Sequence, residues 1–110
     1  MSKNVEEQQP VMEVFDTLSR AHFDENQPNV DLLTQVASTR LLLFSFKAGQ
    51  MLKEHQAPRS ILVQTLQGAI QFRTADRDVT LRPGMILQLA ANISHNVLAQ
   101  TDAIMLVTRL

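Results

Sequence analysis

The chain has 110 residues, which is enough for one small domain with a modest core. Its 10 Lys and Arg and 11 Asp and Glu give a net charge of -1, so it lacks the basic surface that nucleic-acid binding requires. The absence of cysteine excludes disulfides, thiolate metal sites and cysteine nucleophiles. Because no signal peptide and no membrane-length apolar stretch are visible, we expect a cytoplasmic protein with no membrane partner.

Residues 1–29 are predicted to form a disordered N-terminus followed by a short helix. Met1–Gln9 is polar, which is typical of a disordered terminus. Apolar residues then recur at helical spacing, at Val11, Val14, Phe15 and Leu18, and Pro10 suits a first helical position. Residues 24–29 contain Pro28 and are expected to form a loop before the main domain at residues 30–110.

From Val30 onward the pattern is one of short strands separated by turn residues. The expected strands are Val30–Val36, Arg40–Phe46, Gln50–His55, Ser60–Leu66, Ala69–Thr74, Val79–Arg82, Met85–Leu89, Ser94–Ala99 and Ala103–Thr108. Many short strands at this spacing predict an all-β fold, an antiparallel barrel or sandwich.

Two of these runs, Leu41–Phe44 and Ile104–Val107, are apolar on both faces. In a small barrel, only the inward-facing half of the side chains in such a strand is buried in the barrel core. The outer face therefore needs a further layer, either the N-terminal helix or a second subunit, and we expect a homodimer.

Glycines and histidines are spaced in a repeating way along the strand region. Gly49 is followed after five residues by His55 and then by Gly68, and Pro83-Gly84 is followed by His95. Glycine supplies the positive φ angles that tight turns between strands demand. Over residues 41–108 this spacing resembles the small single-domain cupins of the RmlC-like superfamily. The resemblance implies a β-barrel of the jelly-roll or double-stranded β-helix type, which the short N-terminal helix expected from the apolar spacing would precede.

The departures from the cupin motifs fall on the metal ligands. The family's first motif has a second histidine and a glutamate, where this chain has Ala57 and Ile61. In the second motif, Ala90, Asn92 and Ala99 replace a proline, a glycine and an asparagine. The chain is thus similar to a metal-poor branch of the family, with either no cofactor or a weakly bound divalent metal (Zn, Fe, Mn or Ni).

The candidate binding residues follow from the motif positions and from strand alternation. If His55 faces inward, Met51 and Ala57 share its face, and Ile61 occupies the inward place of the family's glutamate. The candidate ligand-binding residues are His55, His95, Met51, Ala57 and Ile61, and His55 and His95 are the candidate metal ligands.

Each candidate also has a plainer interpretation. The imidazoles could simply satisfy one another or water as buried polar groups, and Met51 could be core filler. Arg59 follows Pro58 and could either rim a pocket and bind an anion or be an ordinary exposed turn residue.

The leading functional hypothesis is a cupin-domain protein with a degenerate metal site that binds a small, mostly apolar molecule. The alternative is a metal-dependent enzyme of the dioxygenase or isomerase type that uses His55 and His95. A third is a sensor module that acts through a partner. No hydrolase or kinase motif is present, and the sequence singles out no catalytic residue.

Overall fold

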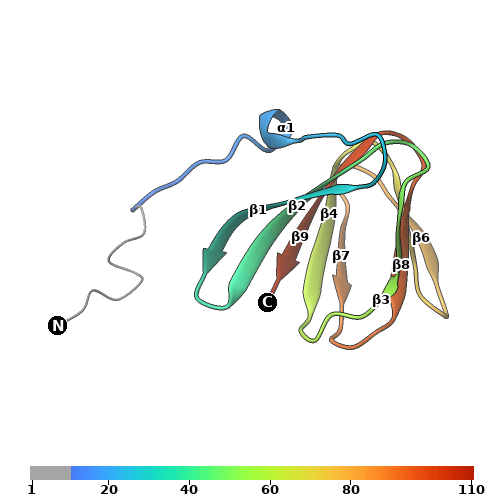
Figure 1. Ribbon diagram of the computed structural model, residues 1–110. Coiled ribbons are helices and arrows are strands. Elements are labelled where there is room, and N and C mark those ends of the chain that lie inside the picture. Colours follow the sequence, from blue (N-terminus) through green and yellow to red (C-terminus); the bar gives the residue numbers. More distant parts are fainter. Residues whose placement is uncertain (1–10) are drawn as a thin grey trace.

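The computed structural model describes residues 11–110, which form two antiparallel sheets that face each other (Figure 1). The larger sheet has the order β1 (Asn29–Val36), β2 (Thr39–Phe46), β9 (Ala103–Arg109), β4 (Ile61–Gln67) and β7 (Ile86–Leu89). The smaller sheet has the order β3 (Met51–His55), β8 (His95–Ala99), β5 (Ile70–Arg73) and β6 (Asp78–Leu81). The predicted all-β jelly-roll class is confirmed. Both ends of every strand lie within one residue of the predicted ends.

The turns between strands use glycine as the sequence predicts. Gly49, Gly68 and Gly84 adopt positive φ angles of 88°, 81° and 94°. At Gly68 the requirement is steric as well, because a Cβ atom there would clash with the backbone carbonyl oxygen of Asp102. No other residue fits this close approach of two chain segments without a backbone shift.

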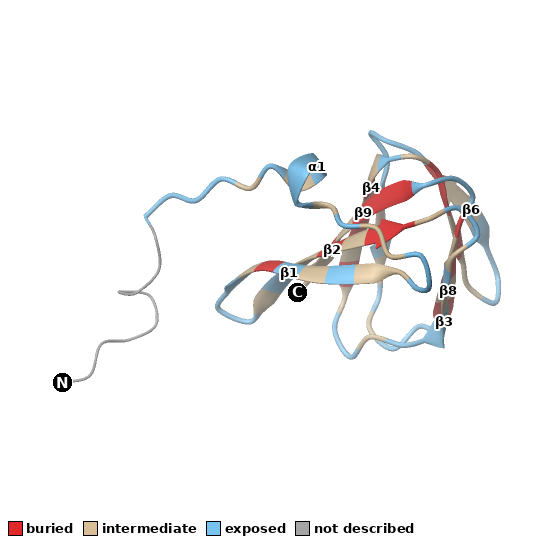
Figure 2. Cartoon of the chain, turned by 45° about the horizontal axis from the view of Figure 1, so that its top comes forward, coloured by how far each residue is buried: buried red, intermediate tan, exposed pale blue. Residues whose placement is uncertain are grey.

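The main core lies between the two sheets and is built from their inner faces. Figure 2 shows its buried stretches on β4, β8 and β9. The strands alternate as half-buried strands should: Ile61, Val63 and Thr65 of β4 are buried, whereas the residues between them are half-buried. The buried members of this core include Phe46, Ile70, Phe72, Leu81, Val97 and Met105.

A second apolar cluster covers the outer face of the larger sheet. Leu33, Leu43 and Ile104 are buried there under Phe15 and Phe23, which belong to the segment before β1. The outer face of the two-sided apolar runs is therefore covered, at least in part, by the chain's own N-terminal segment, which was one of the two layers expected.

Polar contacts fix the N-terminal segment in this position. Arg20 forms an ion pair with Asp31 of β1 at 3.1 Å. The backbone N–H of His22 donates to Ser45 Oγ at 3.1 Å, and Gln50 Nε2 donates to the carbonyl oxygen of Asp24 at 2.7 Å. The segment is thus tied to β1, to β2 and to the start of β3.

The predicted helix is shorter than expected and begins later. α1 spans Thr17–Arg20, with Asp16 as its N-cap accepting a hydrogen bond from the Ser19 N–H at 3.4 Å. Val11 and Val14 lie outside it and are exposed, so their helical spacing was misleading. An Asp side chain at an N-cap fixes where a helix starts, and here it outweighs the apolar periodicity. The expected disorder of Met1–Gln9 and the helical role of Pro10 lie outside the described residues.

None of the helical structure within residues 11–110 is long and apolar enough to cross a membrane.

Candidate functional site

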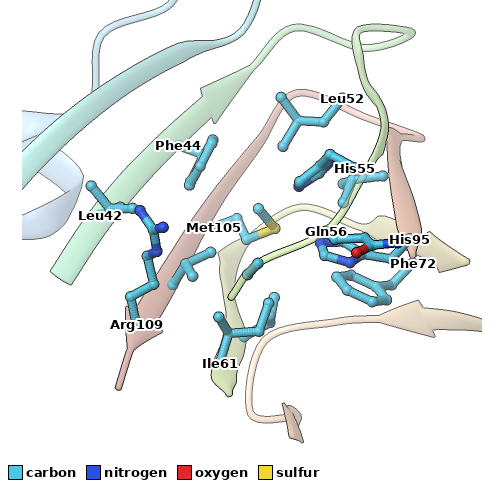
Figure 3. A pocket seen from close by; sticks show the side chains of 14 residues that line it. Leu42, Phe44, Leu52, His55, Gln56, Ile61, Phe72, His95, Met105 and Arg109 are labelled. Carbon is cyan, nitrogen blue, oxygen red and sulfur yellow. The ribbon is translucent and has the colours of Figure 1, made fainter. Parts of the chain in front are cut away.

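A cavity of about 230 Å³ lies between the two sheets, near the end where β3 stops and β4 and β8 begin. Figure 3 shows its side chains converging from both sheets. The lining is mostly apolar, and its polar groups are two imidazoles, one amide and one guanidinium. The lining residues are Leu42, Phe44, Leu52, His55, Gln56, Ala57, Ile61, Val63, Phe72, His95, Val97, Met105, Val107 and Arg109.

His55 and His95 face each other across the β3–β8 pair on one side of this cavity (Figure 3). They are direct partners in the strand register, and their ring centroids are 4.2 Å apart with the planes tilted by 60°. His95 also stacks on Phe72, at 5.0 Å and 13°. The two histidines that the sequence analysis expects to meet therefore lie side by side, with His95 buried and His55 exposed.

The protonation of each ring follows from its hydrogen bonds. His55 Nδ1 lies 2.6 Å from the carbonyl oxygen of Lys53, and His95 Nδ1 lies 2.8 Å from that of Ile93. Since a carbonyl oxygen only accepts, both Nδ1 atoms must carry the proton. In the neutral rings each Nε2 atom then keeps a free lone pair, able to accept a hydrogen bond from a ligand or to bind a metal.

His95 is held in its neutral form by its surroundings. Its side chain is only 3% exposed, and this burial lowers its pKa below the usual value of 6.5. The hydrogen bond to the Ile93 carbonyl works in the opposite direction, and the nearby His55 adds a smaller lowering effect. At neutral pH, His95 thus offers the cavity an acceptor rather than a positive charge.

The loop before β8 is tied to the loop before β4 and to the end of β3. The Asn92 N–H donates to the carbonyl oxygen of Ala57 at 2.8 Å, and Ser94 Oγ donates to Glu54 Oε2 at 2.7 Å. Because Ala57 lies in the loop before β4 and Glu54 lies in β3, these bonds connect the start of β8, which carries His95, to both of these elements.

Four of the five predicted site residues line the cavity, and Met51 does not. His55, His95, Ala57 and Ile61 are among its walls. Met51 is 46% exposed, and its neighbour Leu52 takes the inward place. The reason is a register shift in the β3–β8 pair between Leu52 and His55, which breaks the alternation counted back from His55.

Several lining residues were not named as site residues from the sequence. Phe44, Phe72 and Met105 form the apolar walls, and Arg109 lies on the side away from the histidines (Figure 3). Alternation along β2, β5 and β9 predicts which side chains of each strand share a face, but only the arrangement of the two sheets brings these faces to the same cavity. Gln56 comes from the loop after β3, where no periodic signal exists.

The residues at this site do not fit the usual cupin metal centre of three histidines and one carboxylate. His55 and His95 supply two nitrogen donors, while the other two ligand places hold Ala57 and Ile61. Nowhere in residues 11–110 do three or more His, Asp or Glu side chains gather in a way that could hold an ion. Any metal here would depend on water or a bound molecule for at least two ligands.

Comparison with known proteins relates the chain to solved structures only. No protein-family model matches it, and no curated protein matches its sequence. An RmlC-like cupin from Desulfovibrio desulfuricans is 27% identical with a TM-score of 0.80, over 88% of this chain and 94% of that one. A cupin superfamily protein from Desulfitobacterium hafniense is 26% identical with a TM-score of 0.81, over 92% of this chain and 93% of that one.

Proposed function

For this chain, which is a small cupin of the RmlC-like type, we propose a role in binding a small, mostly apolar molecule between its two sheets. The observation that carries the proposal is the cavity of about 230 Å³, with apolar walls and two imidazoles on one side. Pockets for drug-sized ligands occupy about 300–1,000 Å³, so the ligand is a smaller molecule.

The histidine pair supports a further feature of the ligand. Both Nδ1 protons are used by backbone carbonyls, which leaves the Nε2 lone pairs as acceptors. A ligand with a hydroxyl or amine group would donate to one of them. A ligand without such a donor would leave the acceptor of buried His95 unpaired, at a cost in affinity.

Methionine methyl groups provide a sensitive test of this proposal. In protein labelled with ¹³C at the methionine methyls, titration with phenol should shift the signal of Met105, which is 1% exposed and lines the cavity. The signal of Met51, which lies outside the cavity and is 46% exposed, is the internal control and should stay in place. Shifts at Met51 without shifts at Met105 would refute cavity binding.

The role of the imidazoles can be separated from that of the cavity. Fluorobenzene matches phenol in shape but cannot donate a hydrogen bond. We expect the double variant His55→Ala, His95→Ala to lose the preference for phenol over fluorobenzene while still binding both, since the apolar walls remain. An unchanged preference would show that the histidines do not contact the ligand.

One observation favours the metal-dependent enzyme as a second candidate. Imidazoles that bind metals through Nε2 commonly donate their Nδ1–H to a backbone carbonyl, as His55 and His95 do. Elemental analysis of untagged protein tests it: stoichiometric Zn, Fe, Mn or Ni, lost in the double histidine variant, would favour the enzyme. Metal-free protein that still binds phenol would favour the binding role.

A further inference from the structure

A second hollow, of about 270 Å³, adjoins the cavity near the end of β9. Three of its lining residues are arginines, Arg40, Arg59 and Arg109, and the others are Gln35, Ser38 and Leu110. Arg109 lines both this hollow and the cavity, so the two spaces share one guanidinium-bearing side chain.

The strand register places these positive charges together. Arg40 of β2 and Arg109 of β9 are direct partners, so both side chains project from the same face of the sheet. Arg59 comes from the loop before β4, and this loop is held to the end of β9 by the Leu110 N–H, which donates to the Ser60 carbonyl oxygen at 3.1 Å. Like charges directly opposite each other on neighbouring strands destabilise a sheet unless something offsets them.

Within residues 11–110, no Asp or Glu side chain lines this hollow. The ion pairs in this part of the chain join Arg20 to Asp31, Lys47 to Glu25 and Arg73 to Asp78, and none involves the three arginines of the hollow. Arg40 Nε donates to Gln35 Oε1 at 3.2 Å, but an amide oxygen carries no charge. Among the residues that the structure describes, the hollow is therefore lined by three guanidiniums and by no acidic side chain.

We infer that Arg40, Arg59 and Arg109 bind an anionic group, a carboxylate or a phosphate, that belongs to the ligand of the cavity. The planar guanidinium matches the oxygens of either group with two parallel hydrogen bonds. Arg109 and the histidine pair lie on opposite sides of the cavity (Figure 3). The ligand class is thus a small organic anion whose apolar body extends from Arg109 toward His55 and His95. That assignment of the body depends on the proposed binding function, whereas the arginine site does not.

Inorganic phosphate tests the arginine site alone, because it needs no apolar cavity. We expect a titration with phosphate at low ionic strength to shift the arginine Nε–H signals of Arg40, Arg59 and Arg109, and to spare that of Arg82 in the β6–β7 turn. Phosphate shifts that are equal across all arginines, or absent from these three, would overturn the inference. Added salt should weaken the response, since Arg40 and Arg59 are exposed.

Phenylacetate and its neutral amide, phenylacetamide, test the link to the cavity. The wild-type protein should bind phenylacetate roughly tenfold more tightly, the difference expected for a charge-assisted hydrogen bond. The double variant Arg40→Gln, Arg59→Gln should lose most of this preference, and the matched control Arg82→Gln should keep it. Dispersed NMR spectra would verify that each variant is folded.

The possible failures of this test are distinguishable. Equal binding of the two probes to the wild type, or a preference that survives in the double variant, would overturn the inference and leave the proposed function standing. If neither probe perturbs the Met105 methyl while phosphate still shifts the three arginines, the proposed function fails and the arginine site remains.

Discussion

His95 combines several physical effects at a single position. It is buried against Phe72 and His55, it donates its only proton to a backbone carbonyl, and burial lowers its pKa. Protonation would place a second donor, and a charge, in an apolar cavity. The folded state therefore favours the neutral imidazole of His95, and the free energy of unfolding should depend on pH.

We predict that the free energy of unfolding falls as the pH drops below about 6.5, the usual histidine pKa. Above that value His95 is neutral in both states and contributes no pH dependence. Below it the unfolded chain takes up a proton that the folded site resists, so acid favours unfolding. Urea unfolding between about pH 7.5 and pH 5 measures the effect.

The variant His95→Asn should have a weaker pH dependence, because the titrating ring is gone. His22→Asn is the matched control, since His22 is exposed and lies away from the cavity lining. If the two variants show the same dependence as the wild type, the burial of His95 does not govern acid stability.

Asn92 shows how a departure from the family motif can preserve the backbone. This chain has Asn92 where the resemblance implies a glycine, and its φ is 66°, in the left-handed region. Asparagine tolerates that region better than other non-glycine residues. Asn92 can therefore adopt a backbone conformation that suits glycine, and its N–H donates to the Ala57 carbonyl oxygen.

At the scale of the elements, the strands could be predicted because turn residues separate alternating apolar runs. The register of those strands could not be predicted from alternation alone. The shift between Leu52 and His55 leaves no mark in the sequence Met51-Leu52-Lys53-Glu54-His55, and it exchanges Met51 for Leu52 in the cavity wall. Likewise, the pairing of Arg40 with Arg109 joins residues far apart in the chain, which no local pattern reveals.

The register shift in β3 leads to a prediction about two neighbouring residues. Leu52→Ala removes a side chain that packs against the main core, and we expect it to lower the free energy of unfolding by about 1–3 kcal/mol. Met51→Ala should change it by less than about 0.5 kcal/mol, because Met51 is largely exposed. Urea denaturation of both variants measures the contrast. If Met51→Ala lowered the free energy of unfolding more than Leu52→Ala does, β3 would have regular alternation, with Met51 on the same face as His55.

At the scale of the whole molecule, an apolar surface remains on β1 after the two clusters are formed. β1 is an edge strand of the larger sheet. Val30 and Leu32 are each 49% exposed, although their register partners Phe44 and Leu42 line the cavity. The cavity face of the larger sheet thus continues onto β1, where its side chains are half open to solvent. Exposed apolar residues along an edge strand are a hazard unless a partner covers them.

We propose that a second copy of the chain covers this surface of β1, which gives a homodimer. Sedimentation at micromolar concentration should give about twice the monomer mass of 12.4 kDa. Leu32→Lys should shift the protein toward the monomer, because it places a charge where apolar side chains would be desolvated. Ile86→Lys is the matched control: Ile86 lies on β7, the opposite edge of the same sheet, and is 59% exposed. A wild-type monomer, or a monomer produced equally by both substitutions, would contradict an interface on β1.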